Sequence, residues 1–230
     1  MMKKYDLHCH SHFSVDSLNN PQDLVRRYYK LGFSGFAITD HNSFKAYEQA
    51  QEYVKRKKID IEVIPACEFG TSRGEVIGLY LQEMIYQKDF ACLCDAIHDQ
   101  GGFVILPHPF DSFRKSATHP DKFDKEDLRF VDAIETINGH VLLKNDNLKA
   151  MEFADLHSFA KTAGSDAHLL IECASAFTTI ADEMGLDIAI RSKNTCANGK
   201  QIPFYTRGIP TLIKIAKKVG LIKKDIENTC

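Results

Sequence analysis

The sequence predicts an α/β fold in which parallel strands close into a barrel. Short apolar runs with strand character alternate with longer segments of helical period along the 230 residues, and this alternation is typical of strands joined by helical crossovers. The run over 61–66 has almost no polar interruption, as expected of a strand covered on both faces. Histidines and acids follow the ends of several such runs, which is where barrel enzymes place their sites.

The expected elements alternate from one end of the chain to the other. Between Pro21 and Gly32, apolar side chains repeat every three or four residues, which predicts the first helix. Asn42 or Ser43 is expected to cap the second helix, which runs through Lys57. Further helices are expected near 89–100, 146–156 and 211–219. Strands are expected at 5–7, 36–39, 61–66, 76–81, 103–106, 133–136, just before 164, and at 177–180.

A single domain is expected to fill residues 1–230, because α/β barrels commonly reach this length and 44% of the residues are hydrophobic. Lys and Arg number 29 against 31 Asp and Glu, so the net charge of −2 provides no global field to attract nucleic acid or an anionic membrane. The pair Lys217-Lys218 is interpreted as part of a solvated helix surface.

Cellular location is predicted from apolar runs and cysteines. No apolar run reaches membrane-spanning length, and no secretory leader precedes Tyr5. The seven cysteines are an odd number, and their spacing matches neither a zinc ribbon nor a thioredoxin-type pair. Reduced thiols in a cytoplasm are therefore expected.

Imidazoles and carboxylates gather at the strand ends in a pattern that suits two or three adjacent divalent metal ions. Because side chains alternate along a strand, His8 and His10 face the same side and can share one ion, while Cys9 points away. Glu68 is the candidate bridge between two ions, and such a ligand set accepts zinc, manganese or iron. The residues in this pattern are His8, His10, Asp16, Asp40, His41, Glu68, His108, Asp166 and His168.

At these residues the chain resembles the polymerase and histidinol phosphatase (PHP) family, phosphoesterases of the amidohydrolase type built on a distorted, TIM-like (β/α)7 barrel. The resemblance spans residues 5–168, and its motifs are specific in their order and combination. Residues 138–176 also look like the terminal segment of small stand-alone members. The matching motifs are DLHCHS at 6–11 with Asp16, ITDHN at 38–42, PACE at 65–68, His108-Pro109, and GSDAH at 164–168.

The resemblance implies a cluster of three ions. Asp40 would support a ligand or assist catalysis, and either Asp40 or His168 would transfer a proton to the leaving group. The implied ligands are His8, His10, Glu68 and Asp166 for the first ion, Glu68 and His108 for the second, and Asp16, His41 and His168 for the third.

One position departs from the family pattern. Many members carry a further histidine on the strand between the positions of Glu68 and His108, and Ile77 stands there in this chain. The second ion would then lack an imidazole, so two ions rather than three are an open alternative.

Two arginines are candidates for binding a phosphate group. Arg114 follows His108 closely and is the first choice, with Arg207 as the second. Glu135 could reach the strand ends or simply pair with a neighbour. The remaining histidines are interpreted as ordinary surface or core residues, with His12 the one that could touch the site: His12, His98, His119, His140 and His157.

The expected activity is hydrolysis of a phosphate ester of a small metabolite or nucleotide by a metal-activated water. A small substrate is expected because the chain has no basic stripe and no interleaved aromatic and basic residues to hold a polymer. Three alternatives stay open: an exonuclease acting on nucleic-acid ends, a C–N hydrolase of the amidohydrolase type, and a non-catalytic module that metal stabilises. No pattern specifies the ester or an oligomeric state.

Overall fold

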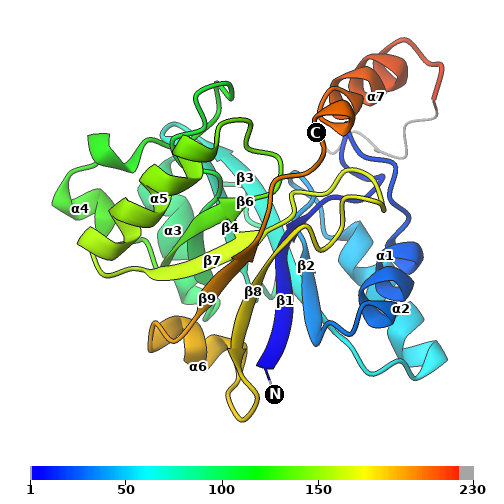
Figure 1. Ribbon diagram of the computed structural model, residues 1–230, viewed down its shortest axis with the longest axis horizontal. Coiled ribbons are helices and arrows are strands. Elements are labelled where there is room, and N and C mark those ends of the chain that lie inside the picture. Colours follow the sequence, from blue (N-terminus) through cyan, green and yellow to red (C-terminus); the bar gives the residue numbers. More distant parts are fainter. Residues whose placement is uncertain (1, 223–230) are drawn as a thin grey trace.

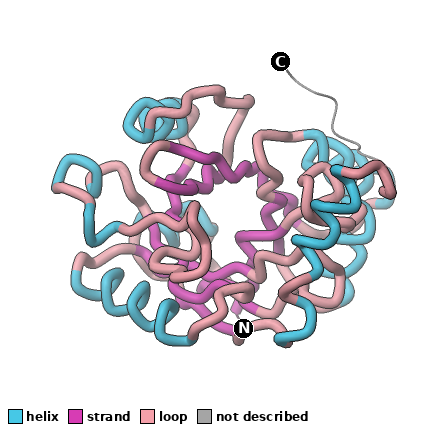
Figure 2. The backbone as a smooth tube through the Cα atoms, turned by 90° about the horizontal axis from the view of Figure 1, so that it is seen from above, coloured by secondary structure: helices cyan, strands magenta, loops and turns pink. Residues whose placement is uncertain are grey.

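A computed structural model describes residues 2–222 and contains one nine-stranded sheet with the strand order β7-β6-β5-β4-β3-β2-β1-β8-β9. The sheet curls into a nearly closed barrel with helices around it (Figures 1 and 2). The predicted barrel is thus confirmed. The strands are β1 (Met2–Cys9), β2 (Gly35–Ile38), β3 (Glu62–Thr71), β4 (Gly74–Leu79), β5 (Phe103–Leu106), β6 (Ala133–Asn138), β7 (Ala160–Gly164), β8 (Ala176–Ala181) and β9 (Cys196–Gly199).

The barrel closes beside the residues that are expected to bind metal. Cys9 at the end of β1 forms a parallel bridge with Ala167, which follows β7. Two backbone hydrogen bonds extend this contact: the Asp166 N–H donates to the His8 carbonyl over 2.7 Å, and the His10 N–H donates to the Ala167 carbonyl over 2.9 Å. The first and last histidine motifs of the chain are therefore held side by side by the backbone itself.

The expectation of an all-parallel sheet is wrong at β4, which runs antiparallel to both β3 and β5. Only Ser72 and Arg73 separate β3 from β4, and a parallel pair would need a crossover of a dozen or more residues. The sequence carried this signal, because no helical segment lies between the runs at 61–66 and 76–81. Strand β8 is also antiparallel to β1, and β9 to β8.

Helices cover the outside of the barrel on two sides (Figure 1). Helices α1 and α2 pack on the outer face of β1–β3, and α3 and α5 pack on the outer face of β4–β6. Helix α6 lies near the amino-terminal end of β1, whereas α7 lies at the opposite end (Figure 1). The helices are α1 (Pro21–Lys30), α2 (Lys45–Lys57), α3 (Phe90–Asp99), α4 (Lys125–Leu128), α5 (Lys144–Leu156), α6 (Leu186–Arg191) and α7 (Ile209–Lys218), with 3-10 turns at Pro120–Lys122 and Phe204–Thr206.

Local chemistry explains where the helices begin. Asn20 caps α1 by accepting from the Gln22 N–H, and Asp89 caps α3 by accepting from the Cys92 N–H. The predicted cap of α2 is wrong, because Phe44 occupies the cap position without a side-chain bond. Helices α4 and α6 and strand β9 were not predicted, since each has only four to six residues and shows little periodicity.

The barrel interior is filled by apolar side chains up to the level of the metal-binding motifs. Leu7, Ile64, Ile77 and Ile105 belong to this inner cluster, and Leu186 of α6 closes it from below. Inward-facing side chains fill a barrel as a packed core rather than a pore. The candidate metal ligands therefore lie beyond this apolar core, at the end of the barrel opposite α6 (Figure 1). Within residues 2–222, no helix is long and apolar enough to cross a membrane.

Candidate metal centre

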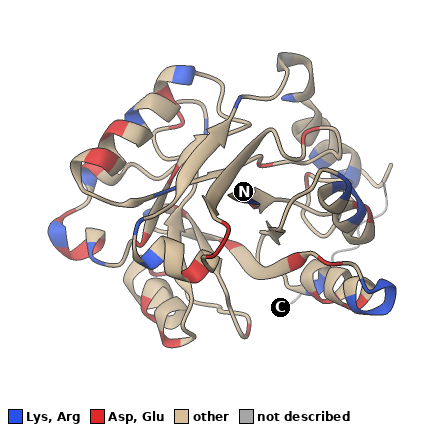
Figure 3. Ribbon diagram, turned by 60° about the horizontal axis from the view of Figure 1, so that its bottom comes forward, with Lys and Arg blue, Asp and Glu red and all other residues tan. Residues whose placement is uncertain are grey.

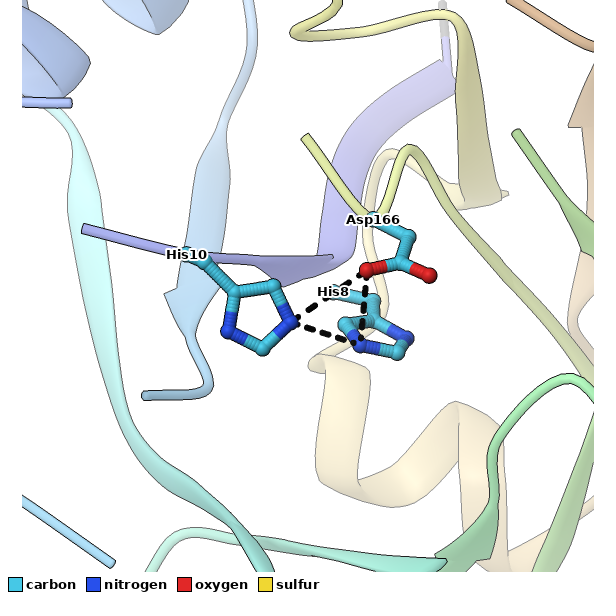
Figure 4. A group of neighbouring side chains, drawn as sticks. All are labelled: His8, His10 and Asp166. Carbon is cyan, nitrogen blue, oxygen red and sulfur yellow. Dashed lines mark hydrogen bonds and ion pairs between the residues drawn. The ribbon is translucent and has the colours of Figure 1, made fainter. Parts of the chain in front are cut away.

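Two histidines of β1 and an aspartate beyond β7 form the first group of candidate ligands (Figure 4). The Nε2 atoms of His8 and His10 lie 3.3 Å apart, and each is within 3.5 Å of Asp166 Oδ1. Glu68 on β3 adds its Oε2 atom at 3.6 Å from His8 Nε2 and 3.4 Å from His10 Nε2. All four side chains are buried. The four residues implied for the first ion thus converge on one point.

A bulge in β1 aims these two imidazoles. The pairing of β1 with β2 shifts register between Asp6 and Cys9. Two consecutive side chains therefore face inward: Leu7 packs in the inner core, and His8 faces the candidate metal group. Bulges commonly redirect side chains next to active sites. Cys9 packs outward among apolar residues, as predicted.

Glu135 on β6 holds the imidazole of His8 from behind. Its carboxylate lies 3.1 Å from His8 Nδ1 and also accepts from the His108 N–H at 2.7 Å and from Asn138 Nδ2 at 2.9 Å. A proton on Nδ1 leaves the Nε2 lone pair facing the metal group. Gly164 permits this packing, because a Cβ there would lie 2.3 Å from the His8 Cβ. Of the two roles expected for Glu135, it thus reaches the strand ends, where it contacts His8 and His108.

Three carboxylate oxygens show that the first and third groups fit cations. Glu68 Oε2, Asp166 Oδ1 and Asp16 Oδ1 are buried without a hydrogen-bond partner in the described chain. Each faces imidazole nitrogens at 3.3 to 3.6 Å. Desolvated carboxylates of this kind are stabilised by a coordinated cation, and the mixed set of imidazole and carboxylate suits zinc, manganese or iron.

The third group surrounds Asp16, in the loop after β1. Its Oδ1 lies 3.6 Å from His168 Nε2, and its Oδ2 lies 4.0 Å from His41 Nε2. The Nδ1 atom of His41 lies 3.4 Å from Glu68 Oε2, so His41 connects the first and third groups. The structure therefore brings Asp16, His41 and His168 together, as the resemblance implied.

His168 is arranged as a ligand rather than as a proton donor. Its Nδ1 lies 2.7 Å from the carbonyl of Asp166, which places the proton on that nitrogen and leaves Nε2 free to face Asp16. Burial, reinforced by the nearby His10, lowers the pKa of His168 to about 3. A neutral imidazole binds metal but carries no proton to give at neutral pH. This placement argues against the proposed proton transfer by His168.

Asp40 lies behind the histidines and does not line the cleft above them. It accepts hydrogen bonds from the Ser11 N–H at 2.7 Å and from Ser14 Oγ at 2.8 Å. The Ser14 hydroxyl also lies 3.3 Å from His10 Nδ1. Of the two roles expected for Asp40, supporting a ligand is the one that this geometry favours.

The group expected for the second ion differs from the other two. Glu68 Oε1 lies 3.1 Å from His108 Nε2, as expected. Ile77, however, packs in the barrel interior with 1% of its surface exposed, and the β4 residue that faces the group is Glu75, whose Oε2 is 3.6 Å from His108 Nε2. Ile77 lies opposite Glu68 in the pairing of β3 with β4, so its assignment to the position of the missing histidine stays a prediction, and Glu75 is a further carboxylate beside His108. A guanidinium nitrogen of Arg114 also lies 3.0 Å from His108 Nε2.

The candidate metal-binding groups open into a cleft of about 450 Å³. Both arginines proposed for phosphate binding line it, and Arg207 is held by the carbonyls of Leu142 and Ile202. His140 also lines the cleft, although sequence analysis treated it as an ordinary histidine, and its Nε2 lies 3.2 Å from Glu172 Oε2. The cleft residues are His10, Asp16, His41, Glu75, Asp111, Phe113, Arg114, Ser116, His140, Leu142, His168, Arg207, Pro210, Thr211 and Lys214.

Comparison with known proteins explains this arrangement. The model of the PHP domain family matches residues 6–176. The chain belongs to the PHP domain family. An uncharacterized protein of Methanocaldococcus jannaschii is 35% identical over 184 residues, covering 78% of this chain and 71% of that protein. A 5'-3' exoribonuclease of Haemophilus influenzae is 39% identical over 83 residues, which cover 34% of this chain and 29% of that enzyme.

Solved structures show the same fold as this PHP domain. A two-domain protein of Bacteroides vulgatus, described as containing a predicted PHP-like metal-dependent phosphoesterase, aligns with a TM-score of 0.72 at 22% identity, over 93% of this chain and 70% of that one. An amidohydrolase of Chromobacterium violaceum aligns with a TM-score of 0.54 at 16% identity, over 71% of this chain and 87% of that one. Both likenesses support the TIM-like barrel.

Two candidate ligands of the PHP domain lie in strained backbone. His108 and Asp166 have φ values of +32° and +54°, which side chains other than glycine rarely adopt. Such strain costs about 1 to 3 kcal/mol per residue and clusters at functional sites. Aspartate and histidine are among the non-glycine residues that adopt positive φ most often.

Helix α7 is fastened to the rim of the PHP domain by one buried lysine. Lys217 donates to the carbonyls of His12, Ser14 and Ser17 over 2.7 to 2.9 Å, and it is only 3% exposed. The interpretation of this residue as a solvated surface charge was wrong, because the ammonium binds the loop that carries Asp16. The same helix contributes Thr211 and Lys214 to the cleft.

We expect Lys217→Met to destabilise the protein by about 2 kcal/mol or more, because three buried carbonyls lose a charged donor. Substrate KM should rise as well, since α7 forms one wall of the cleft. The matched control is Lys218→Met, which removes an exposed lysine from the same helix. Thermal unfolding followed by circular dichroism measures the first effect, and equal melting temperatures for the two variants would contradict the anchoring role.

The charges of the cluster are strongly coupled. Burial lowers the pKa of His8, but the carboxylates of Asp166, Glu135 and Glu68 outweigh burial and raise it well above its usual value. Burial raises the pKa of Glu68, but the imidazoles of His8 and His41 lower it well below its usual range. Without metal, protons on the imidazoles therefore neutralise the carboxylates.

This coupling predicts how stability depends on pH. The lowered pKa of Glu68 stabilises the fold above about pH 4.3, and this contribution is lost as the pH falls through the folded-state pKa. The raised pKa of His8 stabilises the fold below about pH 6.5, and this contribution is lost as the pH rises through the folded-state pKa. We therefore expect the chelated protein to be most stable between these two values, while stabilisation by added metal grows towards pH 8.

Circular dichroism melting at pH 5, 6.5 and 8, with chelator and with manganese, measures both trends. The chain has no tryptophan, so ellipticity is a better signal here than intrinsic fluorescence. A chelated protein whose melting temperature rises steadily up to pH 8 would contradict the expected coupling.

The other histidines that sequence analysis set aside lie off the cleft. His12 contacts the Asn19 carbonyl and the ring of Phe13. His98 pairs with Asp132 on the outer surface, and His157 stacks near Phe153. The residues missed from the sequence are thus Glu75, His140 and Lys214, and none of them belongs to a motif of its own.

Proposed function

We propose that this PHP domain is a metal-dependent phosphoesterase that hydrolyses a small phosphate ester. The observation that carries the proposal is the position of three cationic side chains, Arg114, Arg207 and Lys214, around a cleft whose floor is the His and carboxylate cluster. Cations at the wall of such a cleft suit a phosphate group that approaches bound metal ions.

When bound at this cluster, divalent ions would supply an activated water at neutral pH and would neutralise developing negative charge. The first group would hold one ion through His8, His10, Glu68 and Asp166. The third would hold another through Asp16, His41 and His168, with the Asp16 oxygens 3.6 to 4.0 Å from the two imidazoles. The remaining steps belong to the protein's own side chains. Arg207 and Lys214 bind phosphate oxygens from the cleft wall, and His140, supported by Glu172, is the imidazole placed to protonate a leaving group.

A small substrate suits the surface better than a polymer. Lys and Arg alternate with Asp and Glu over the outer helices (Figure 3), and the net charge is −2. A protein that follows a nucleic-acid backbone needs a continuous basic groove. The partial match to an exoribonuclease of Haemophilus influenzae favours nucleotides and nucleic-acid ends as the second candidate class.

The test is hydrolysis by the manganese- or zinc-loaded protein. The substrates are a chromogenic phosphate monoester and diester, a panel of mononucleotides, and short 5'-phosphorylated RNA and DNA. We expect metal-dependent release of phosphate from at least one small ester, and loss of that release on chelation. Turnover confined to oligonucleotides, with steep salt dependence, would favour the exonuclease.

Two further outcomes would overturn the proposal. Hydrolysis of an N-acyl or cyclic amide panel without any phosphate ester would identify the C–N hydrolase alternative. A metal-dependent gain in melting temperature without turnover of either class would identify a non-catalytic module that metal stabilises.

A further inference from the structure

The place expected for a second ion already contains a positive charge. Arg114 Nη1 lies 3.0 Å from His108 Nε2, and Arg114 Nη2 lies 2.7 Å from Asp166 Oδ2. The same guanidinium lies 3.9 Å from Glu75 Oε2 and 3.6 Å, through Nε, from Asp111 Oδ2. It is thus surrounded by the groups that would face the ion.

The nitrogen of His108 cannot serve both partners. An imidazole nitrogen has one lone pair, so His108 Nε2 cannot accept a hydrogen bond from Arg114 and bind a metal ion at the same time. His8, Glu68 and His108 each place one ligand atom within 4.8 Å of the others, but His8 has other partners. Its Nδ1 is engaged by Glu135, and its Nε2 is needed beside His10 and Asp166.

The residue on β4 fits a guanidinium better than an ion. Glu75 Oε2 accepts a hydrogen bond from Ser116 Oγ at 2.8 Å and faces Arg114. A carboxylate at this position stabilises a guanidinium. A protonated imidazole there would repel the guanidinium, and a neutral imidazole would offer a lone pair to a metal ion. With Arg114 against His108 and Glu75, the second position therefore suits a guanidinium better than a metal ion.

We propose that the guanidinium of Arg114 takes the place of the second ion, so that this PHP domain binds two metal ions and uses Arg114 as a fixed third cation. Glu75 is the residue that positions Arg114. The expected number of ions rests on the contacts of Arg114 and does not depend on the proposed function. The use of Arg114 against a phosphate oxygen rests on the proposed function.

The test is a metal titration without substrate. Native mass spectrometry and elemental analysis of the full-length protein give the number of manganese or zinc ions bound at saturation. We expect two ions in the unmodified protein, two in Glu75→Gln, and three in the double variant Arg114→Gln with Glu75→His, which adds an imidazole and removes the competing cation.

Three results would each overturn the inference. They are three ions in the unmodified protein, a lower count in Glu75→Gln, which would make Glu75 a ligand, and only two ions in a folded double variant. Circular dichroism establishes folding of each variant. Because no ester is present, the absence of phosphate turnover leaves the ion count standing, and a count of three leaves the hydrolytic function standing.

Discussion

Replacement of Asp166 by asparagine is expected to remove bound metal and hydrolytic activity together. Asp166 Oδ1 has no hydrogen-bond partner in the described chain and lies within 3.5 Å of His8 Nε2 and His10 Nε2. An amide places either a neutral oxygen or an NH2 group at this point, so the charge that offsets the cation is lost. Loss of several kcal/mol of transition-state stabilisation corresponds to a fall in kcat/KM of about 1000-fold.

Elemental analysis and a steady-state assay on the same preparation measure both effects. Asp146→Asn is the matched control, because Asp146 is equally buried but accepts from Ser112, away from the histidines. We expect this control to keep its metal. Unchanged metal content in Asp166→Asn would show that the first site has been assigned to the wrong residues.

The part of the site that the sequence predicted consists of residues in short motifs at strand ends. His8 and His10 were placed on one face by the two-residue repeat of a strand, and Asp166 and His168 were placed at the same rim by the order of strands in a barrel. The bulge in β1 departs from the two-residue repeat, and it could not be predicted because it depends on the pairing of β1 with β2. The prediction therefore gave the right ligands without the backbone shift that aims them.

The parts that were missed depend on contacts between distant segments. Pairing places Ile77 of β4 opposite Glu68 and Ile105, whereas Glu75 on the same strand approaches His108 and Arg114. Lys217 looked like a solvated charge because its three carbonyl partners lie about 200 residues away. A local sequence pattern shows neither the pairing of strands nor the hydrogen bonds between distant segments.

Glu135→Gln is expected to have the second large effect, although Glu135 touches no expected ion. Its carboxylate accepts from three donors, the His8 ring, the His108 N–H and the Asn138 amide. A glutamine has one acceptor oxygen, and its NH2 group would face at least one of these donors. The proton on His8 Nδ1 would then be poorly held, and the Nε2 lone pair would turn away from the first site.

Loss of a hydrogen-bonded partner behind a metal-binding histidine weakens metal affinity by about 10- to 100-fold, and we expect at least this change for the first ion. A competition titration with a metal-sensitive dye measures the affinity, and Asp146→Asn again controls for removal of a buried carboxylate. Glu135→Asp separates charge from reach, because it keeps the charge but shortens the side chain. If Glu135→Gln bound metal as tightly as the unmodified protein, the orientation of His8 would have to come from the bulge and Gly164 alone.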